Sequence, residues 1–261
     1  MREWNADAYH RVSDPQLAWG LAVLGRLRFI GHERVLDVGC GTGRLTEHLA
    51  WRLPRGRVIA VDLSAPMLAA ARSYLEPLVG RRVVFARADA SALPFRDAVD
   101  AVFSTATFHW VPDHERLFRS LLAALKPGGR LVAQCGGGPN LARMLERCGE
   151  LIASPPFERY FAGWEAPWLC ADAASTARRL ADAGFVAVDT SEQYAPVALP
   201  SAEAFRDFIT HVICQPYLAR IADPELQSRF IDLLVEQYAG DHPAFELDYW
   251  RLNVAGRRRQ L

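Results

Sequence analysis

Residues 35–43 read VLDVGCGTG, and this stretch decides the fold. The apolar run before Gly39 has the length of a buried strand, and helical spacing begins near Arg44. Glycines allow a ligand to lie against the backbone, and the start of a helix offers free N–H groups to a negatively charged group. The stretch therefore predicts a strand, a glycine-rich turn and a helix around a nucleotide-like ligand.

The spacing of the glycines excludes two common nucleotide sites. A dinucleotide fingerprint, G-x-G-x-x-G, needs a glycine where Arg44 or Thr46 stands, and the G-K-[ST] of a P-loop is absent from the sequence. Asp62 ends the next apolar run, where its carboxylate could accept both hydroxyls of a ribose. Because NAD-binding proteins share this geometry, Asp62 indicates a ribose without identifying the cofactor.

Short apolar runs alternate with helical patterns through the first half of the chain. Apolar character on both faces is typical of parallel strands covered by helices, and Ser64 and Asp113 are suitable helix caps. The pattern predicts an α/β, doubly wound (Rossmann-like) fold. The expected strands are 34–38, 57–61, 83–86, 99–103 and 130–133, with later strands at 185–190 and 245–254, the last at or next to a sheet edge.

Residues 35–43 resemble motif I of the class I S-adenosylmethionine-dependent methyltransferases. Three further segments are similar to that family in the expected order: 61–67 with its Asp and Met, 87–90, and the turn at 125–129. The resemblance implies a seven-stranded methyltransferase sheet that ends in an antiparallel hairpin. It also implies an enzyme that binds S-adenosylmethionine and releases S-adenosylhomocysteine.

The resemblance assigns a set of cofactor-binding residues. Asp62, Met67 and Asp89 would hold the adenosine, and the glycine turn with Asp37 would hold the methionine amine and carboxylate. Asp37 could instead support the loop, Asp62 could be a simple cap, and Cys40 could serve only as a small packing residue. The full set is Asp37, Gly39, Cys40, Gly41, Thr42, Gly43, Asp62, Leu63, Met67, Asp89, Ala90 and Ser104.

Residues 104–113 follow the fourth strand at the edge of the sheet where open α/β folds bind ligands. We expect the catalytic residues His109 and Trp110 here. His109 could be a general base or a hydrogen-bonded residue that supports the site, and Trp110 could donate its indole N–H to a carboxylate or only pack at the rim. A metal at His109, Asp113 and His114 is not expected, because Pro112 interrupts any regular face.

The N-terminal residues 4–9 and Gln16 resemble a branch that contains trans-aconitate methyltransferase and the juvenile hormone acid methyltransferases, which esterify free carboxylates. The branch implies Tyr9, Gln16 and Trp110 as substrate-binding residues, although Tyr9 and Gln16 could also belong to a helix that packs over the cofactor. A carboxylic acid with a pKa near 4 is already an anion at neutral pH, so its methylation needs no base. A phenol or alcohol would make His109 essential.

The expected function is methyl transfer from S-adenosylmethionine to a small molecule, most simply O-methylation of a carboxylate. The alternatives are an O-, N- or C-methyltransferase of a specialised metabolite, or a cofactor-binding protein without catalysis. Lys and Arg number 30 and Asp and Glu 30, so no net field attracts nucleic acid or anionic lipid, although a buried arginine could meet a small anion. Five cysteines without a C-x-x-C pair, no signal peptide and no membrane span suggest a cytoplasmic protein. As a separate expectation, the protein is a monomer or a weak dimer.

We expect one methyltransferase domain. An α/β core needs about 180 of the 261 residues, which leaves about 80 for inserts near the last strands. The aromatic residues between 157 and 168 could form core or a pocket lid. The expected segments are an N-terminal helical cover (1–30), the cofactor-binding core (31–136), a helical insert (137–184), a strand (185–197), a helical lid insert (198–244) and a closing strand (245–256).

Overall fold

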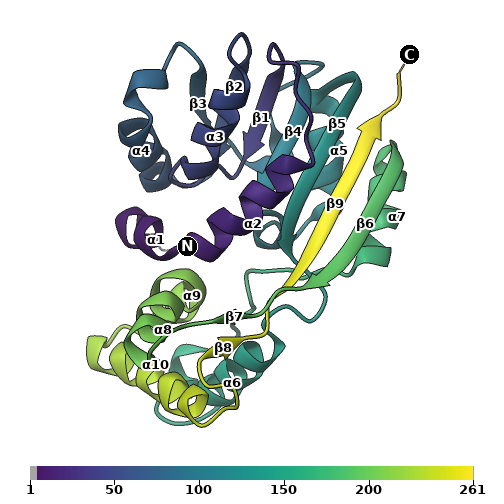
Figure 1. Ribbon diagram of the computed structural model, residues 1–261. Coiled ribbons are helices and arrows are strands. Elements are labelled where there is room, and N and C mark those ends of the chain that lie inside the picture. Colours follow the sequence, from purple (N-terminus) through teal and green to yellow (C-terminus); the bar gives the residue numbers. More distant parts are fainter. Residues whose placement is uncertain (1–4, 261) are drawn as a thin grey trace.

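The computed structural model describes residues 5–260 and contains a seven-stranded sheet in the order β3-β2-β1-β4-β5-β9-β6 (Figure 1). Strands β1 to β5 pair in parallel, and β9 runs antiparallel to both β5 and β6. The doubly wound sheet with an antiparallel C-terminal pair is thereby confirmed. The strands are β1 (Arg34–Val38), β2 (Arg57–Asp62), β3 (Val83–Arg87), β4 (Val99–Thr105), β5 (Leu125–Gly136), β6 (Phe185–Tyr194) and β9 (Trp250–Arg258).

Helices cover both faces of the sheet. One face carries α2 (Asp14–Gly25), α3 (Arg44–Arg52) and α4 (Ala65–Tyr74), and the other carries α5 (His114–Ala124) and α7 (Ala173–Ala183). Alternate residues of β1 point to opposite faces, so Val35 enters one hydrophobic cluster while Leu36 and Val38 enter the other. Ser64 and Asp113 cap α4 and α5 through their side chains, as the sequence predicts.

A second, mainly helical layer lies beside the carboxyl ends of the parallel strands, and we call it the lid (Figure 1). It comprises α6 (Ala142–Ile152), α8 (Ala202–Phe208), the π-helix η5 (Ile209–Ile213), α9 (Gln215–Leu218), α10 (Pro224–Ala239) and the paired strands β7 (Val197–Ala198) and β8 (Glu246–Leu247). Its buried residues form a third hydrophobic cluster, the lid cluster: Leu141, Met144, Cys148, Phe157, Phe161, Phe205, Phe208, Ile209, Ile213, Cys214, Tyr217, Leu218, Ile221, Phe230, Ile231, Leu234, Tyr238, Leu247 and Tyr249.

The expected closing strand at 245–254 is wrong in its bounds. Phe245 has a left-handed φ of 55°, and the Tyr249 N–H donates to the Leu247 carbonyl at 3.0 Å, so the chain turns between two strands. The first piece, β8, pairs with β7 in the lid, and β9 continues to Arg258 in the main sheet. The position of β9 next to the edge strand agrees with the expectation.

The segment 137–184 divides between the two layers. Its first part, with α6 and the short helix η4 (Glu158–Tyr160), belongs to the lid, whereas Leu180 of α7 is buried in a cluster under the sheet. Three further short 3-10 helices connect the strands: η1 (Glu76–Leu78), η2 (Ala90–Ala92) and η3 (Phe108–Trp110).

The N-terminal helices join sheet and lid. Helix α1 (Ala6–Val12) packs against η5, and Trp19 of α2 packs against the lid cluster. Trp4, part of the N-terminal pattern in the sequence, lies outside the described residues. Across residues 5–260, the helices are too short or too polar for any of them to cross a membrane.

Candidate active site

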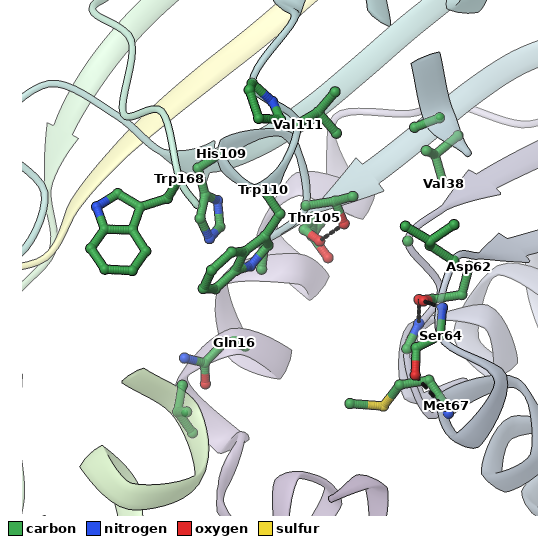
Figure 2. A pocket seen from close by; sticks show the side chains of 18 of the residues that line it. Gln16, Val38, Asp62, Ser64, Met67, Thr105, His109, Trp110, Val111 and Trp168 are labelled. Carbon is green, nitrogen blue, oxygen red and sulfur yellow. Dashed lines mark hydrogen bonds between the residues drawn. The ribbon is translucent and has the colours of Figure 1, made fainter. Parts of the chain in front are cut away.

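A cavity of about 820 Å³ lies at the carboxyl ends of β1, β2 and β4, where the strand order reverses, and lid residues such as Leu141 and Ile213 form part of its wall. Ligands of open α/β sheets bind at such a reversal. In Figure 2 Gln16, His109, Trp110 and Trp168 lie on one side of the cavity, and Asp62, Ser64 and Met67 lie on the other. We call these sides the acceptor half and the cofactor half.

The glycine turn forms one wall of the cofactor half. Gly39 and Gly41 both line the cavity and have positive φ values of 73° and 54°. A Cβ on Gly39 would collide with the Thr107 side chain, whereas a Cβ on Gly41 would meet no protein atom within 4 Å. The Gly41 position therefore leaves open space against the backbone, as a bound cofactor requires.

The Asp62 carboxylate is fixed at the end of β2. One oxygen accepts the Gly41 N–H and the other accepts the Ser64 N–H, each at 2.9 Å. These bonds tie the glycine turn to the start of α4 and hold the carboxylate at the cavity wall. The expected cofactor residues Leu63 and Met67 line the cavity beside it.

Asp89 and Ala90 complete the cofactor half. The Asp89 carboxylate accepts the N–H and the hydroxyl of Ser91, each at 2.8 Å, and so caps η2. Both expected residues line the cavity next to Ala88. The structure therefore brings together Gly39, Gly41, Asp62, Leu63, Met67, Asp89 and Ala90 from the expected cofactor set.

Five of the expected cofactor residues lie behind the cavity wall: Asp37, Cys40, Thr42, Gly43 and Ser104. Asp37 is buried and accepts the Thr46 hydroxyl of α3 at 2.6 Å, and burial raises its pKa to about 7. Asp37 therefore contacts Thr46 beneath the glycine turn, which agrees with a role in supporting the loop.

The other four also support the turn. Cys40 is buried among apolar neighbours, and burial raises the pKa of its thiol. Thr42 Oγ1 lies 2.9 Å from His10 Nδ1, Gly43 precedes α3 with a φ of 87°, and the Ser104 hydroxyl donates to the Val38 carbonyl at 2.8 Å. These four residues surround the backbone that faces the cavity.

His109 faces the acceptor half in a defined protonation state. The Gly136 N–H donates to His109 Nδ1 at 3.2 Å, so the neutral ring carries its proton on Nε2. Burial, with the nearby Arg251 charge, lowers the pKa of His109 to about 3. In this arrangement the imidazole has no free lone pair for a substrate proton and offers an N–H donor instead.

Two tryptophans form an aromatic wall beside His109. The rings of Trp110 and Trp168 meet edge to face with centroids 6.1 Å apart, and both line the cavity. Trp168 also packs against Trp164 and Tyr217 of the lid. The aromatic residues between 157 and 168 therefore divide between core and pocket wall: Phe157 is buried in the core, and Trp168 lines the cavity.

Arg251 of β9 is the buried cation of the acceptor half. Its side chain lines the cavity, and the residue is 3% exposed. Its guanidinium lies over the Trp19 ring at 4.5 Å, and its Nε lies 3.4 Å from Oε1 of the Gln134 side chain. Within residues 5–260 no Asp or Glu forms a salt bridge with it, and burial lowers its pKa.

Polar side chains gather around Arg251. Tyr9 and Tyr249 are close enough to interact with its charge, and burial raises the pKa of Tyr9 to about 12, so its hydroxyl stays protonated. Gln16 has a polar contact with Tyr249, while its buried Oε1 has no hydrogen-bond partner in the described part of the chain. The expected substrate residues Tyr9, Gln16 and Trp110 therefore lie together at one cavity.

Sequence reasoning did not assign Arg251, Tyr249, Asn140 or Cys170 to the site, although all four line the cavity, and it left Trp168 open between core and pocket lid. A signal was present for two of them. Tyr249 and Arg251 alternate with Leu247 in a segment expected next to the sheet edge, and an arginine among buried apolar residues suggests a functional charge. No group of His, Cys, Asp or Glu in residues 5–260 is arranged to hold a metal ion.

Comparisons with known proteins agree with this geometry. A family model described as a methyltransferase domain matches residues 35–129. A trans-aconitate 2-methyltransferase from Deinococcus radiodurans is 30% identical over 250 residues, covering 94% of each chain. A trans-aconitate 2-methyltransferase from Escherichia coli O1:K1 is 28% identical over the full length of both chains.

Solved structures share the fold. A phosphoethanolamine N-methyltransferase 2 from Haemonchus contortus, bound to phosphomonomethylethanolamine and S-adenosylhomocysteine, superposes with a TM-score of 0.64 at 20% identity. The match covers 98% of this chain and 57% of that one. The YcgJ protein from Bacillus subtilis gives a TM-score of 0.63 at 16% identity, over 94% and 99% of the two chains.

Proposed function

Because this chain belongs to the class I S-adenosylmethionine-dependent methyltransferases, we propose that it methylates a carboxylate oxygen of a small organic acid and releases a methyl ester. Methyl transfer to a small molecule is the activity that the family relationship establishes. Relatives named trans-aconitate 2-methyltransferase support an acid as the acceptor. The arrangement of the acceptor half supports it independently.

The residues of the cofactor half fit S-adenosylmethionine. The open position at Gly41 leaves room for the ligand against the backbone, and the Asp62 carboxylate, held at the cavity wall, would accept the ribose hydroxyls. Met67, Asp89 and Ala90 would surround the adenine. When bound, S-adenosylmethionine supplies an electrophilic methyl group on a positively charged sulfur.

Arg251 is the observation that carries the proposal. A buried guanidinium without a carboxylate partner is costly, and a bound anion would offset that cost. Guanidinium and carboxylate match in geometry, because two parallel N–H groups can meet two oxygens. The Gln16 amide and the His109 Nε2–H are further donors for the same anion.

The protonation state of the site suits a carboxylate. Such a group is ionised at neutral pH, so no base has to remove a proton before transfer. His109, with its Nδ1 already occupied by the Gly136 N–H, orients the acceptor as a donor. The residues of the acceptor half then contribute alignment and exclusion of water.

Labelled methyl transfer to matched acceptors tests this proposal. With 3-phenylpropanoate and 4-ethylphenol as acceptors, we expect label in the acid alone, in a product that mild alkali hydrolyses to methanol. In His109→Ala the rate on the acid should fall about fivefold, the loss of one neutral hydrogen bond of about 1 kcal/mol. Transfer only to the phenol, with a loss of 10²–10⁴-fold in His109→Ala, would identify a general base and refute the proposal.

A further inference from the structure

We infer that the acceptor is a monocarboxylic acid with an apolar body, and not a polycarboxylate such as the trans-aconitate named for the relatives. The inference rests on the proposed carboxylate chemistry and narrows it. Three features of the cavity carry it: the number of cations on its wall, the composition of the lid face, and the position of the polar groups.

The acceptor half offers one cation. Among the described residues that line the cavity, two have a side chain of the Lys or Arg type, Arg251 and Arg87. Arg87 is exposed on the cofactor half, where its Nε donates to the Leu63 carbonyl at 2.9 Å. Asp113, at the other end of the loop that carries Trp110, adds a negative charge to the wall. One carboxylate can therefore be neutralised by the protein, and further carboxylates cannot.

The lid face of the cavity is apolar. It is formed by Leu141 and Leu145 of the α6 region, by Trp168, and by Val212 and Ile213 of the π-helix. The Cys214 N–H donates to the Ile209 carbonyl at 2.7 Å, and this i to i+5 bond forms the wide turn of a π-helix. Two successive apolar residues of this turn, Val212 and Ile213, line the cavity. A carboxylate against this face would lose its hydration without gaining a partner.

The polar groups of the acceptor half are concentrated around Arg251. Tyr9, Tyr249 and Cys170 all interact with its charge, and Gln16 contacts Tyr249. The site thus has a polar end and an apolar remainder, the complement of an amphipathic acid. This arrangement also favours release of the product, because esterification removes the negative charge of the acid and with it the charge-assisted bond to Arg251.

Binding and transfer by the intact protein test the inference without a variant. Calorimetric titration in the presence of S-adenosylhomocysteine should give affinities that rise about fourfold for each CH₂ from butanoate to octanoate, the increment expected for a buried methylene. Affinity for trans-aconitate should be at least about 100-fold weaker than for octanoate. Equal or tighter binding of trans-aconitate, with transfer of label to it, would overturn the inference.

A charge placed on the lid face tests the same reasoning. Leu145→Lys should weaken octanoate binding at least about tenfold and strengthen trans-aconitate binding by a similar factor, because it adds a second cation to the half-buried wall. Ile30→Lys is the matched control, since Ile30 is 72% exposed and away from the cavity. No change in the selectivity ratio of a folded Leu145→Lys protein would contradict the inference.

The outcomes separate this inference from the proposed function. Esters formed on trans-aconitate but not on octanoate would leave carboxylate methylation intact and refute the apolar acceptor. Transfer to phenols alone would refute both.

Discussion

Replacing Arg251 by Met should make the protein more stable and less active. Arg251 is 3% exposed and has no Asp or Glu as a salt-bridge partner in residues 5–260, so the folded chain bears the cost of removing a charge from water. An anion bound in the acceptor half would offset this free-energy cost. A methionine of similar length fills the space without a charge.

The size of the stability change follows from the contacts of Arg251. Desolvation of one buried ion costs several kcal/mol. The interaction with the Trp19 ring at 4.5 Å returns roughly 0.5–2 kcal/mol, and the 3.4 Å contact with Gln134 is long for a hydrogen bond. We expect a net gain of about 1–3 kcal/mol, or a rise in Tm of about 2–6 °C for a chain of this size.

The activity change has the opposite sign. Loss of a charge-assisted hydrogen bond of about 1.5–3 kcal/mol should lower kcat/KM for the carboxylate by about 10- to 150-fold. Arg251→Lys keeps the charge but loses the planar pair of donors, so its kcat/KM should lie between those of Arg251→Met and the unchanged protein.

Thermal melting and steady-state kinetics on the same preparations check both signs. The matched control is Arg147→Met, because Arg147 forms a two-point salt bridge with Asp241 at 2.7 and 2.9 Å, and its loss should lower Tm. A fall in Tm of more than about 3 °C in Arg251→Met, with kcat/KM within about twofold, would show that Arg251 is a structural residue.

Two further predictions concern the cofactor half and the residues behind its wall. Asp62→Asn should weaken S-adenosylhomocysteine binding by about 10- to 100-fold in calorimetry, because an amide can accept only one of the two backbone N–H groups that Asp62 now holds; unchanged affinity would remove Asp62 from the site. Asp37→Asn should raise Tm more at pH 8 than at pH 5. Burial raises the pKa of Asp37 to about 7 from an ordinary value near 4, so the stability that this carboxyl contributes in acid is lost as the pH rises through about 7. The amide of an asparagine does not titrate and has no such loss. A difference in Tm that does not vary between the two pH values would contradict the raised pKa.

The central fold was predictable because local and long-range signals agree there. Residues 35–43 combine a buried strand, an obligatory glycine turn and a helix start, and Ser64 and Asp113 mark two further helices with side-chain caps. The break at Phe245 was not predictable, since a left-handed φ at a phenylalanine depends on tertiary packing and has no local signal.

The site was predictable where the backbone determines it. Gly39 and Gly41 of the motif and Asp62 at the end of β2 line one cavity, but the motif does not distinguish these glycines from Cys40 and Thr42, which are buried and do not line it. Arg251 lies far from the motif in sequence and reaches the cavity only because β9 inserts between β5 and β6. The alternation around Arg251 marks it as a buried charge, but only the strand order shows which cavity it reaches.

The lid cluster and the two clusters on the opposite faces of the sheet share no residue. Substitutions in separate clusters tend to have additive effects, because they have no neighbours in common. A descendant of this gene could therefore exchange Leu145, Val212 or Ile213 and acquire a different acceptor while the methyl-donor site keeps its folding energy. Sequence changes that alter the acceptor would then fall mainly in the helices after residue 137, whereas the strands before residue 137, which build the methyl-donor site, would change less.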